Sequence, residues 1–206
     1  MNTPYTSILG ILGIAVAMAA ISSVFAAETS GDFTSEPDKT MAAAHESFVK
    51  KDTDAAARHI HDAANYVKKE SKKVADGSKE DVRKAGHVLE KLGKGVKDGT
   101  VKSEDELTKT FAKVDHALAK GWHATAEASR KAGKNSSEAL RKAGDSLEGA
   151  AKWSGGKLKE GEQASVDALR KAGESTEKEA KAGADQVAQW SKSIADGIKD
   201  LGHKNE

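Results

Sequence analysis

Apolar residues recur along most of the chain at the spacing of an amphipathic helix. In four segments between residues 36 and 132 they lie three and four positions apart, the period that places them on one helix face. We expect the first helix to start after an N-cap at Ser35 and end near Asp52, the second to stop at residues 76–78, and the third to end before Gly99. The three buried stripes are Met41, His45, Phe48 and Val49; then Ala56, Ile60, Ala63, Val67 and Val74; then Val82, Ala85, Leu89, Leu92 and Val96.

The fourth segment has the most regular pattern. Ser103 and Glu106 have the spacing of a capping box, which predicts a helix start. A second stripe of small residues, formed by Ala112, Ala119 and Ala126, lies on the opposite side and leaves room for another helix to pack closely. This helix is therefore expected to be two-sided and central. Its main stripe consists of Leu107, Phe111, Val114, Leu118, Gly121, Thr125, Ala128 and Ala132.

From Gly133 onward large apolar residues become sparse and glycine recurs inside a helical pattern. Arg-Lys-Ala-Gly occurs at residues 83–86, 130–133, 141–144 and 170–173, and the second and third copies are eleven residues apart. A stripe of eleven-residue period runs nearly straight along a helix. Helix breaks are expected at residues 133–137, 155–156 and 173–176. A final seam, made of Val187, Trp190, Ile194, Ile198 and Leu201, predicts a terminal helix that docks on the rest.

These patterns predict an all-α fold, an antiparallel helical bundle with long amphipathic C-terminal helices. The predicted divisions are a signal peptide (1–26), a flexible lead-in (27–35), a helical bundle (36–132), an amphipathic segment rich in Ala, Gly, Lys and Glu (133–186) and a terminal docking helix (187–206).

The N-terminal region has the pattern of an export signal. Residues 8–21 are an apolar run, and Val24 and Ala26 fit the small-residue positions before a cleavage site, so we expect cleavage after Ala26. The protein is then periplasmic or secreted. The alternative is an inner-membrane anchor formed by residues 8–27, which just reach the length that spans a bilayer. The chain has no Cys, so neither a lipid-anchored Cys nor a disulfide is available.

Composition narrows the classes of partner. The chain has 33 basic and 32 acidic residues, a balance that argues against nucleic acid as a partner and against attraction to an anionic membrane as the main purpose. A protein partner or a membrane surface remains compatible with this balance, and the sequence leaves the oligomeric state open. Large apolar residues are few, which predicts a thin core.

Residues 129–183, with their Lys-Ala-Gly copies and eleven-residue spacings, resemble late embryogenesis abundant proteins of the eleven-residue-repeat kind. That resemblance implies protection during water loss, with helix forming on drying or at membranes. The whole mature chain is also similar to exported bacterial helical proteins rich in Ala and Lys, which mostly lack an assigned activity.

Histidines are the candidate ligands, because imidazole is the commonest protein ligand of Zn and Cu and can also hold haem. Of the seven, His45, His59, His116 and His123 are the candidates for a metal (Cu or Zn) or haem site. His116 and His123 are seven residues apart, or about 10 Å along a helix, so they need further ligands to share one metal. The simpler interpretation is that all are ordinary surface or core-edge histidines.

No motif indicates catalysis. The chain has no Cys nucleophile, no Gly-x-Ser-x-Gly and no one-helix metal pairing, so no catalytic residue and no enzymatic activity are predicted. The expected function is that of a non-enzymatic exported structural, protective or interaction protein of the cell envelope. The alternative is a periplasmic metal- or haem-binding protein that uses the histidines.

Overall fold

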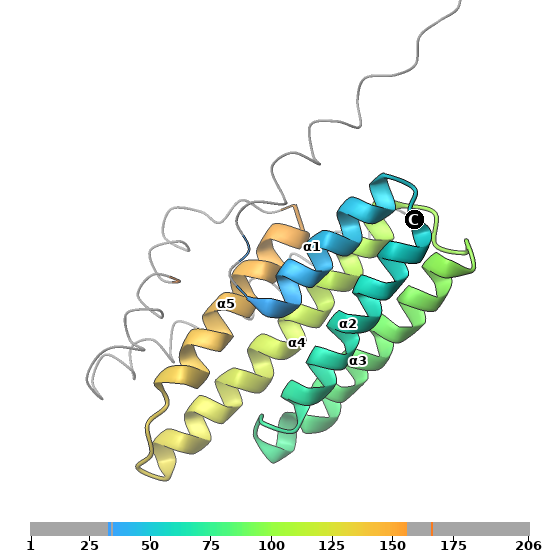
Figure 1. Ribbon diagram of the computed structural model, residues 1–206. Coiled ribbons are helices and arrows are strands. Elements are labelled where there is room, and N and C mark those ends of the chain that lie inside the picture. The colour runs from blue at the N-terminus through green and yellow to red at the C-terminus, as the bar shows by residue number, and fades with distance from the viewer. Residues whose placement is uncertain (1–32, 34, 156–165, 167–206) are drawn as a thin grey trace, which may run out of the picture.

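The computed structural model describes residue 33, residues 35–155 and residue 166, and these residues form a helical bundle (Figure 1). They contain five helices and no strand: α1 (Glu36–Val49), α2 (Thr53–Ser71), α3 (Asp76–Lys97), α4 (Glu104–Lys131) and α5 (Ser137–Trp153). Short connections make successive helices antiparallel neighbours. The predicted all-α bundle is therefore confirmed. The expected export segment at residues 1–26 and the terminal helix at residues 187–206 lie outside the described residues.

Helix ends follow the capping residues in the sequence. The Ser35 side chain accepts a hydrogen bond from the Asp38 backbone N–H, and the Ser103 Oγ accepts one from the Glu106 N–H at 3.3 Å. At the other end of α4, Gly133 has a φ of +65°, a left-handed conformation that glycine adopts without strain. The starts predicted after Ser35 and Ser103 and the break predicted at residues 133–137 are confirmed.

The predicted end of the second helix is wrong. α2 ends at Ser71, and Asp76, which we expected in a break, begins α3. An acidic residue in the first turn of a helix is favourable because the helix dipole is positive there. Val74 lies in the connection rather than on the stripe of α2, yet it is only 3% exposed because it packs against Gly121 of α4.

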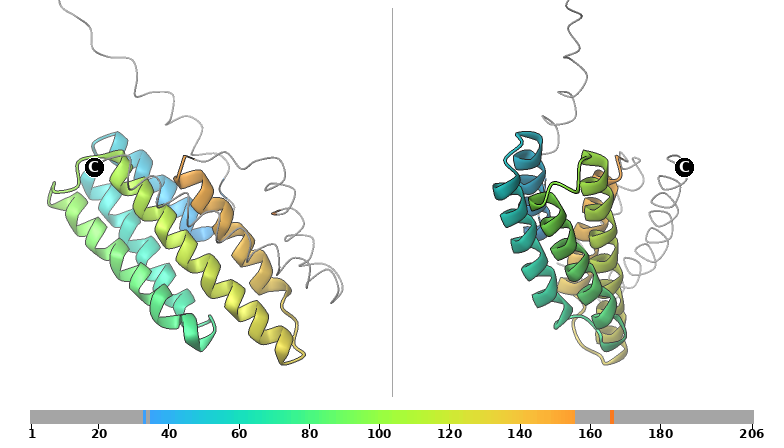
Figure 2. Two further views of the ribbon diagram at one scale, coloured as in Figure 1. Left: turned by 180° about the vertical axis from the view of Figure 1, so that it is seen from behind. Right: turned by 90° about the vertical axis from the view of Figure 1, so that its right-hand side faces the viewer.

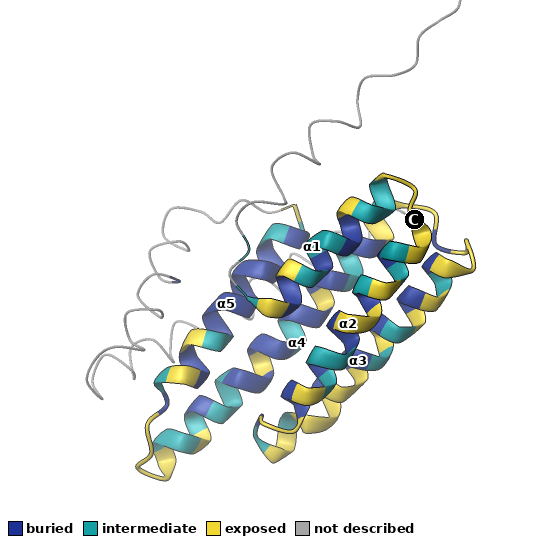
Figure 3. Cartoon of the chain, viewed as in Figure 1, coloured by how far each residue is buried: buried dark blue, intermediate teal, exposed yellow. Residues whose placement is uncertain are grey.

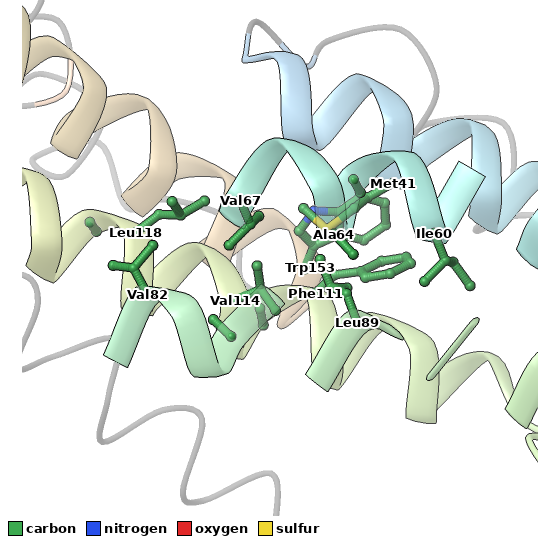
Figure 4. Packing of buried hydrophobic residues seen from close by; sticks show 14 of the residues in the cluster. Met41, Ile60, Ala64, Val67, Val82, Leu89, Phe111, Val114, Leu118 and Trp153 are labelled. Carbon is green, nitrogen blue, oxygen red and sulfur yellow. The ribbon is translucent and has the colours of Figure 1, made fainter. Parts of the chain in front are cut away.

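One core runs through all five helices. Met41, Ile60, Leu89, Phe111 and Trp153 come from different helices and are all buried (Figures 3 and 4). These residues therefore form one continuous hydrophobic core.

α4 is the central helix, packing against α1, α3 and α5, and Figure 2 shows α4 and α5 side by side. The small stripe of Ala112, Ala119 and Ala126 is buried, which confirms that α4 is two-sided. The main stripe ends sooner than expected, since Ala128 and Ala132 are exposed. The Thr125 hydroxyl accepts a hydrogen bond from the N–H of Ala75, which immediately precedes α3. The turns of α4 after Thr125 therefore extend beyond the N-terminal end of α3.

Within the segment at residues 133–186 the structure describes residues 133–155 and 166, which include α5, and α5 joins the same core. Its Leu140, Leu147 and Trp153 are buried in the cluster formed by the other four helices. Among the described residues, no helix is both long and apolar enough to cross a membrane.

Candidate functional site

The structure disperses the candidate histidines over three helices. His45 on α1 is buried, whereas His59 on α2 and His116 and His123 on α4 are partly exposed. Within the described residues, no three His, Asp or Glu side chains are grouped so that they could hold a metal ion. The histidine site proposed from the sequence therefore has no assembled ligand set in this part of the chain.

His45 is a core-edge residue beside an aromatic ring. It is 3% exposed, and its ring centroid lies 6.1 Å from that of Trp153. Burial lowers the pKa of His45, and the carboxylate of Glu104 opposes this shift without outweighing it. The Nε2 of His45 lies 3.6 Å from Glu104 Oε2, which is beyond hydrogen-bonding distance. Burial therefore favours the neutral imidazole of His45.

Two carboxyl groups converge in the interior, and the sequence analysis did not select either one. Asp38 of α1 is 1% exposed and Asp115 of α4 is 0% exposed. Asp38 Oδ1 accepts a hydrogen bond from Trp153 Nε1 at 2.9 Å, and its Oδ2 accepts one from Ser35 Oγ at 2.5 Å. Neither oxygen of Asp115 receives a hydrogen bond from a donor in the described structure. We call Asp38 and Asp115 the carboxyl pair.

Helix geometry explains why both side chains face inward. Asp38 lies three residues before Met41 in the first turn of α1, on the face that enters the core. Asp115 lies four residues after Phe111 and three before Leu118, between the two buried stripes of α4. This position could have indicated from the sequence that Asp115 is buried, because a helix buried on two sides also buries the residue between its two stripes. The pair was not predicted because aspartate side chains are usually solvated.

Burial disfavours two negative charges on the carboxyl pair. Desolvation raises the pKa of Asp115 well above its usual range, and the nearby charge of Asp38 raises it further. Burial also raises the pKa of Asp38, although hydrogen bonds from Asp115, Ser35 and Trp153 oppose that shift. A proton on Asp115 makes it a donor to Asp38, which supplies the partner that its own oxygens otherwise lack.

α5 closes the interior over the carboxyl pair. A Cβ atom at Gly149 would lie 2.6 Å from Asp115 Oδ2 and 2.6 Å from Asp38 Oδ1, so only glycine fits there. Trp153 stacks on Phe33 with ring centroids 4.7 Å apart and meets Phe111 edge-on at 5.0 Å. The pair can hold a proton, but a substrate reaches it only if α5 moves.

A cavity of about 230 Å³ opens nearby between α1, α2, α4 and α5, with Tyr66 and Trp122 in its wall. Glu70 of α2 lies in it, 2.6 Å from Lys73 Nζ and 3.0 Å from Lys142 Nζ of α5. Burial raises the pKa of Glu70, but the hydrogen bonds from these two lysines lower it by more. The Lys142 ammonium also lies 4.2 Å from the centroid of the Trp122 ring. These charges are engaged with one another, and they fasten α5 to α2.

The chain matches no protein-family model, and no curated protein or solved structure is detectably similar to it. The carboxyl pair, the histidines and the cavity are therefore interpreted from their own geometry.

Proposed function

We propose that this protein is a non-enzymatic structural or protective protein of the cell envelope that acts through the surface of a folded helical bundle. The observation that carries this proposal is that the buried carboxyl groups of Asp38 and Glu70 are used to hold helices together. Asp38 joins α1 to α5 through Trp153, and Glu70 joins α2 to α5 through Lys142. Both contacts hold helices together and present no reactive group to a ligand.

The charged surface supports the same function. Many exposed charges pair with a neighbour on the same helix, as Lys79 does with Asp76 at 2.6 Å and Arg83 with Glu80 at 2.7 Å. Exposed pairs of this kind contribute little to stability. They do produce a hydrated surface of alternating charge, which suits weak contacts with membranes or other proteins better than binding to a polyanion.

A drying assay tests the protective role. Vesicles of anionic phospholipid containing a self-quenched dye are dried and rehydrated with the mature chain, residues 27–206. We expect less dye leakage than with an inert protein of the same mass. The matched control is Phe111→Asp, which places a charge in the core and unfolds the bundle. Equal leakage with the intact chain and the inert protein would contradict the protective role.

Circular dichroism of the same samples separates the protective role from a purely structural one. The described helices are expected in buffer, and the resemblance of residues 129–183 to late embryogenesis abundant proteins predicts a gain in helix on drying or with vesicles. A helix content that is complete in buffer and unchanged by drying and vesicles would contradict the protective role and support only the structural one.

Export is tested separately by fractionation and mass spectrometry of the protein from its own cells. We expect a periplasmic or secreted chain whose first residue is Ala27. An intact N-terminus in the membrane fraction would instead support the anchor at residues 8–27.

A further inference from the structure

Three helices meet at the carboxyl pair, and the C-terminal end of α5 is held there. α5 contributes the Gly149 backbone, which covers both carboxyl groups, and the indole of Trp153, which donates to Asp38. The contact of Lys142 with Glu70 lies seven residues earlier on α5 than Gly149, or about 10 Å away along the helix axis. The last turns of α5 are therefore attached to α1 by the hydrogen bond from Trp153 to Asp38, and at Gly149 they lie directly against Asp115 of α4.

The pair has too few donors when both groups are ionised. The Ser35 hydroxyl and the Trp153 indole both donate to Asp38, and among the described residues neither oxygen of Asp115 has a donor. One proton on Asp115 supplies the missing hydrogen-bond donor, because the Asp115 O–H then donates to Asp38. Without that proton, two buried carboxylates face each other with no donor between them, which is strongly unfavourable in a dry interior.

The charged groups around the pair do not replace this proton. From α5, Lys152 attracts the Asp38 carboxylate, but its Nζ lies 2.8 Å from Glu148 Oε1. On α1, burial disfavours the charged form of His45, and on α4, Glu104 is directed to His45. α2 and α3 contribute the apolar Ala64 and Leu89 to the core beside Trp153 (Figure 4), and the charged Glu70 of α2 is engaged by Lys73 and Lys142.

We propose that Asp38 and Asp115 form a proton-operated clasp, in which one shared proton holds the end of α5 against α1 and α4 and its loss to solvent water releases that end. When α5 opens, Asp115 becomes hydrated and gives up its proton near its ordinary pKa of 3.8, whereas the closed state retains the proton to a higher pH. The clasp is therefore tightest in acid and loosens as pH rises. An exported protein would respond in this way to the pH of its surroundings.

Amide hydrogen exchange of the full chain measures the opening of α5 as a function of pH. Exchange in the last turns of α5 is divided by exchange in α2 and α3, which removes the intrinsic pH dependence of the chemistry. We expect this ratio to rise about tenfold per pH unit, starting above pH ~4 and levelling off at the closed-state pKa. A ratio that stays flat with pH would overturn the proposal, as would an increase shared equally by α2 and α3.

Asp115→Asn provides the discriminating variant. The amide has the shape of the protonated carboxyl and donates at every pH, so the exchange ratio should stay low and independent of pH. Asp81→Asn on the exposed surface of α3 is the matched control and should behave as the parent does. An Asp115→Asn chain that retains the tenfold dependence would refute the clasp.

Carbon NMR of the unmodified chain decides the matter even if Asp115→Asn does not fold. The carboxyl carbon of Asp115 should titrate well above the ordinary range of aspartate, in step with the exchange ratio of α5. Titration in the ordinary range would show that the closed pair holds no proton at neutral pH and would overturn the proposal.

Discussion

Gly149→Ala tests how closely α5 approaches the carboxyl pair. The added Cβ would lie 2.6 Å from Asp115 Oδ2, 2.6 Å from Asp38 Oδ1 and 2.7 Å from Asp38 Oδ2. All three oxygens belong to buried side chains, and those of Asp38 are fixed by Ser35 and Trp153. Either the carboxyl groups or the backbone of α5 must therefore move.

Two opposing effects determine the expected free energy of unfolding. Replacing glycine by alanine inside a helix stabilises it by about 1 kcal/mol. Overpacking a filled interior costs about 1–3 kcal/mol, and weakening the two hydrogen bonds to Asp38 costs about 1 kcal/mol for each bond lost. With one hydrogen bond lost, the total cost of about 2–4 kcal/mol exceeds the gain of about 1 kcal/mol, so Gly149→Ala should lower the free energy of unfolding by about 1–3 kcal/mol.

Urea denaturation followed by circular dichroism measures this change. Gly77→Ala in α3 is the matched control, because a Cβ there meets no atom within 4 Å. The control should stabilise the protein by up to about 1 kcal/mol. If Gly149→Ala is as stable as the parent or more so while Gly77→Ala behaves as expected, the close approach of α5 to the carboxyl pair is refuted.

Three further changes probe the other contacts. Trp153→Phe keeps an aromatic ring but removes a hydrogen-bond donor to buried Asp38, so the free energy of unfolding measured in urea should fall by about 1–3 kcal/mol. An unchanged denaturation midpoint would contradict that hydrogen bond. Glu70→Gln should destabilise the protein most at neutral pH. The pKa of Glu70 is lowered in the folded state, so the stability that its carboxylate contributes is present above the ordinary pKa of 4.5 and is lost as pH falls through the folded-state pKa. The parent and Glu70→Gln should therefore converge in strong acid, and a constant difference in denaturation midpoint would count against the lysine contacts. Ser103→Ala removes the N-cap of α4 and should cost about 1 kcal/mol in thermal unfolding, whereas no change would show that the cap is dispensable.

The candidate site was predicted only in part. Helical spacing correctly placed His45 on the buried face of α1, because the wheel position of a residue depends only on its own helix. It could not show that Asp38 and Asp115 meet, since all of α2 and α3 lie between them in the sequence and they come together only when α1 packs beside α4. The pair also breaks the usual expectation that carboxylates stay in water, which tertiary hydrogen bonds and a shared proton make tolerable.

The sequence by itself determined the helical class of the described residues, the starts of α1 and α4 and the break after α4, because helix period, N-caps and glycine conformation act over a few neighbouring residues. Only the tertiary structure decided which wheel positions are dry. It exposed Ala128, buried Asp115 and brought α5 into the core of the other four helices. Burial depends on which distant helix covers a given face, and no local pattern contains that information.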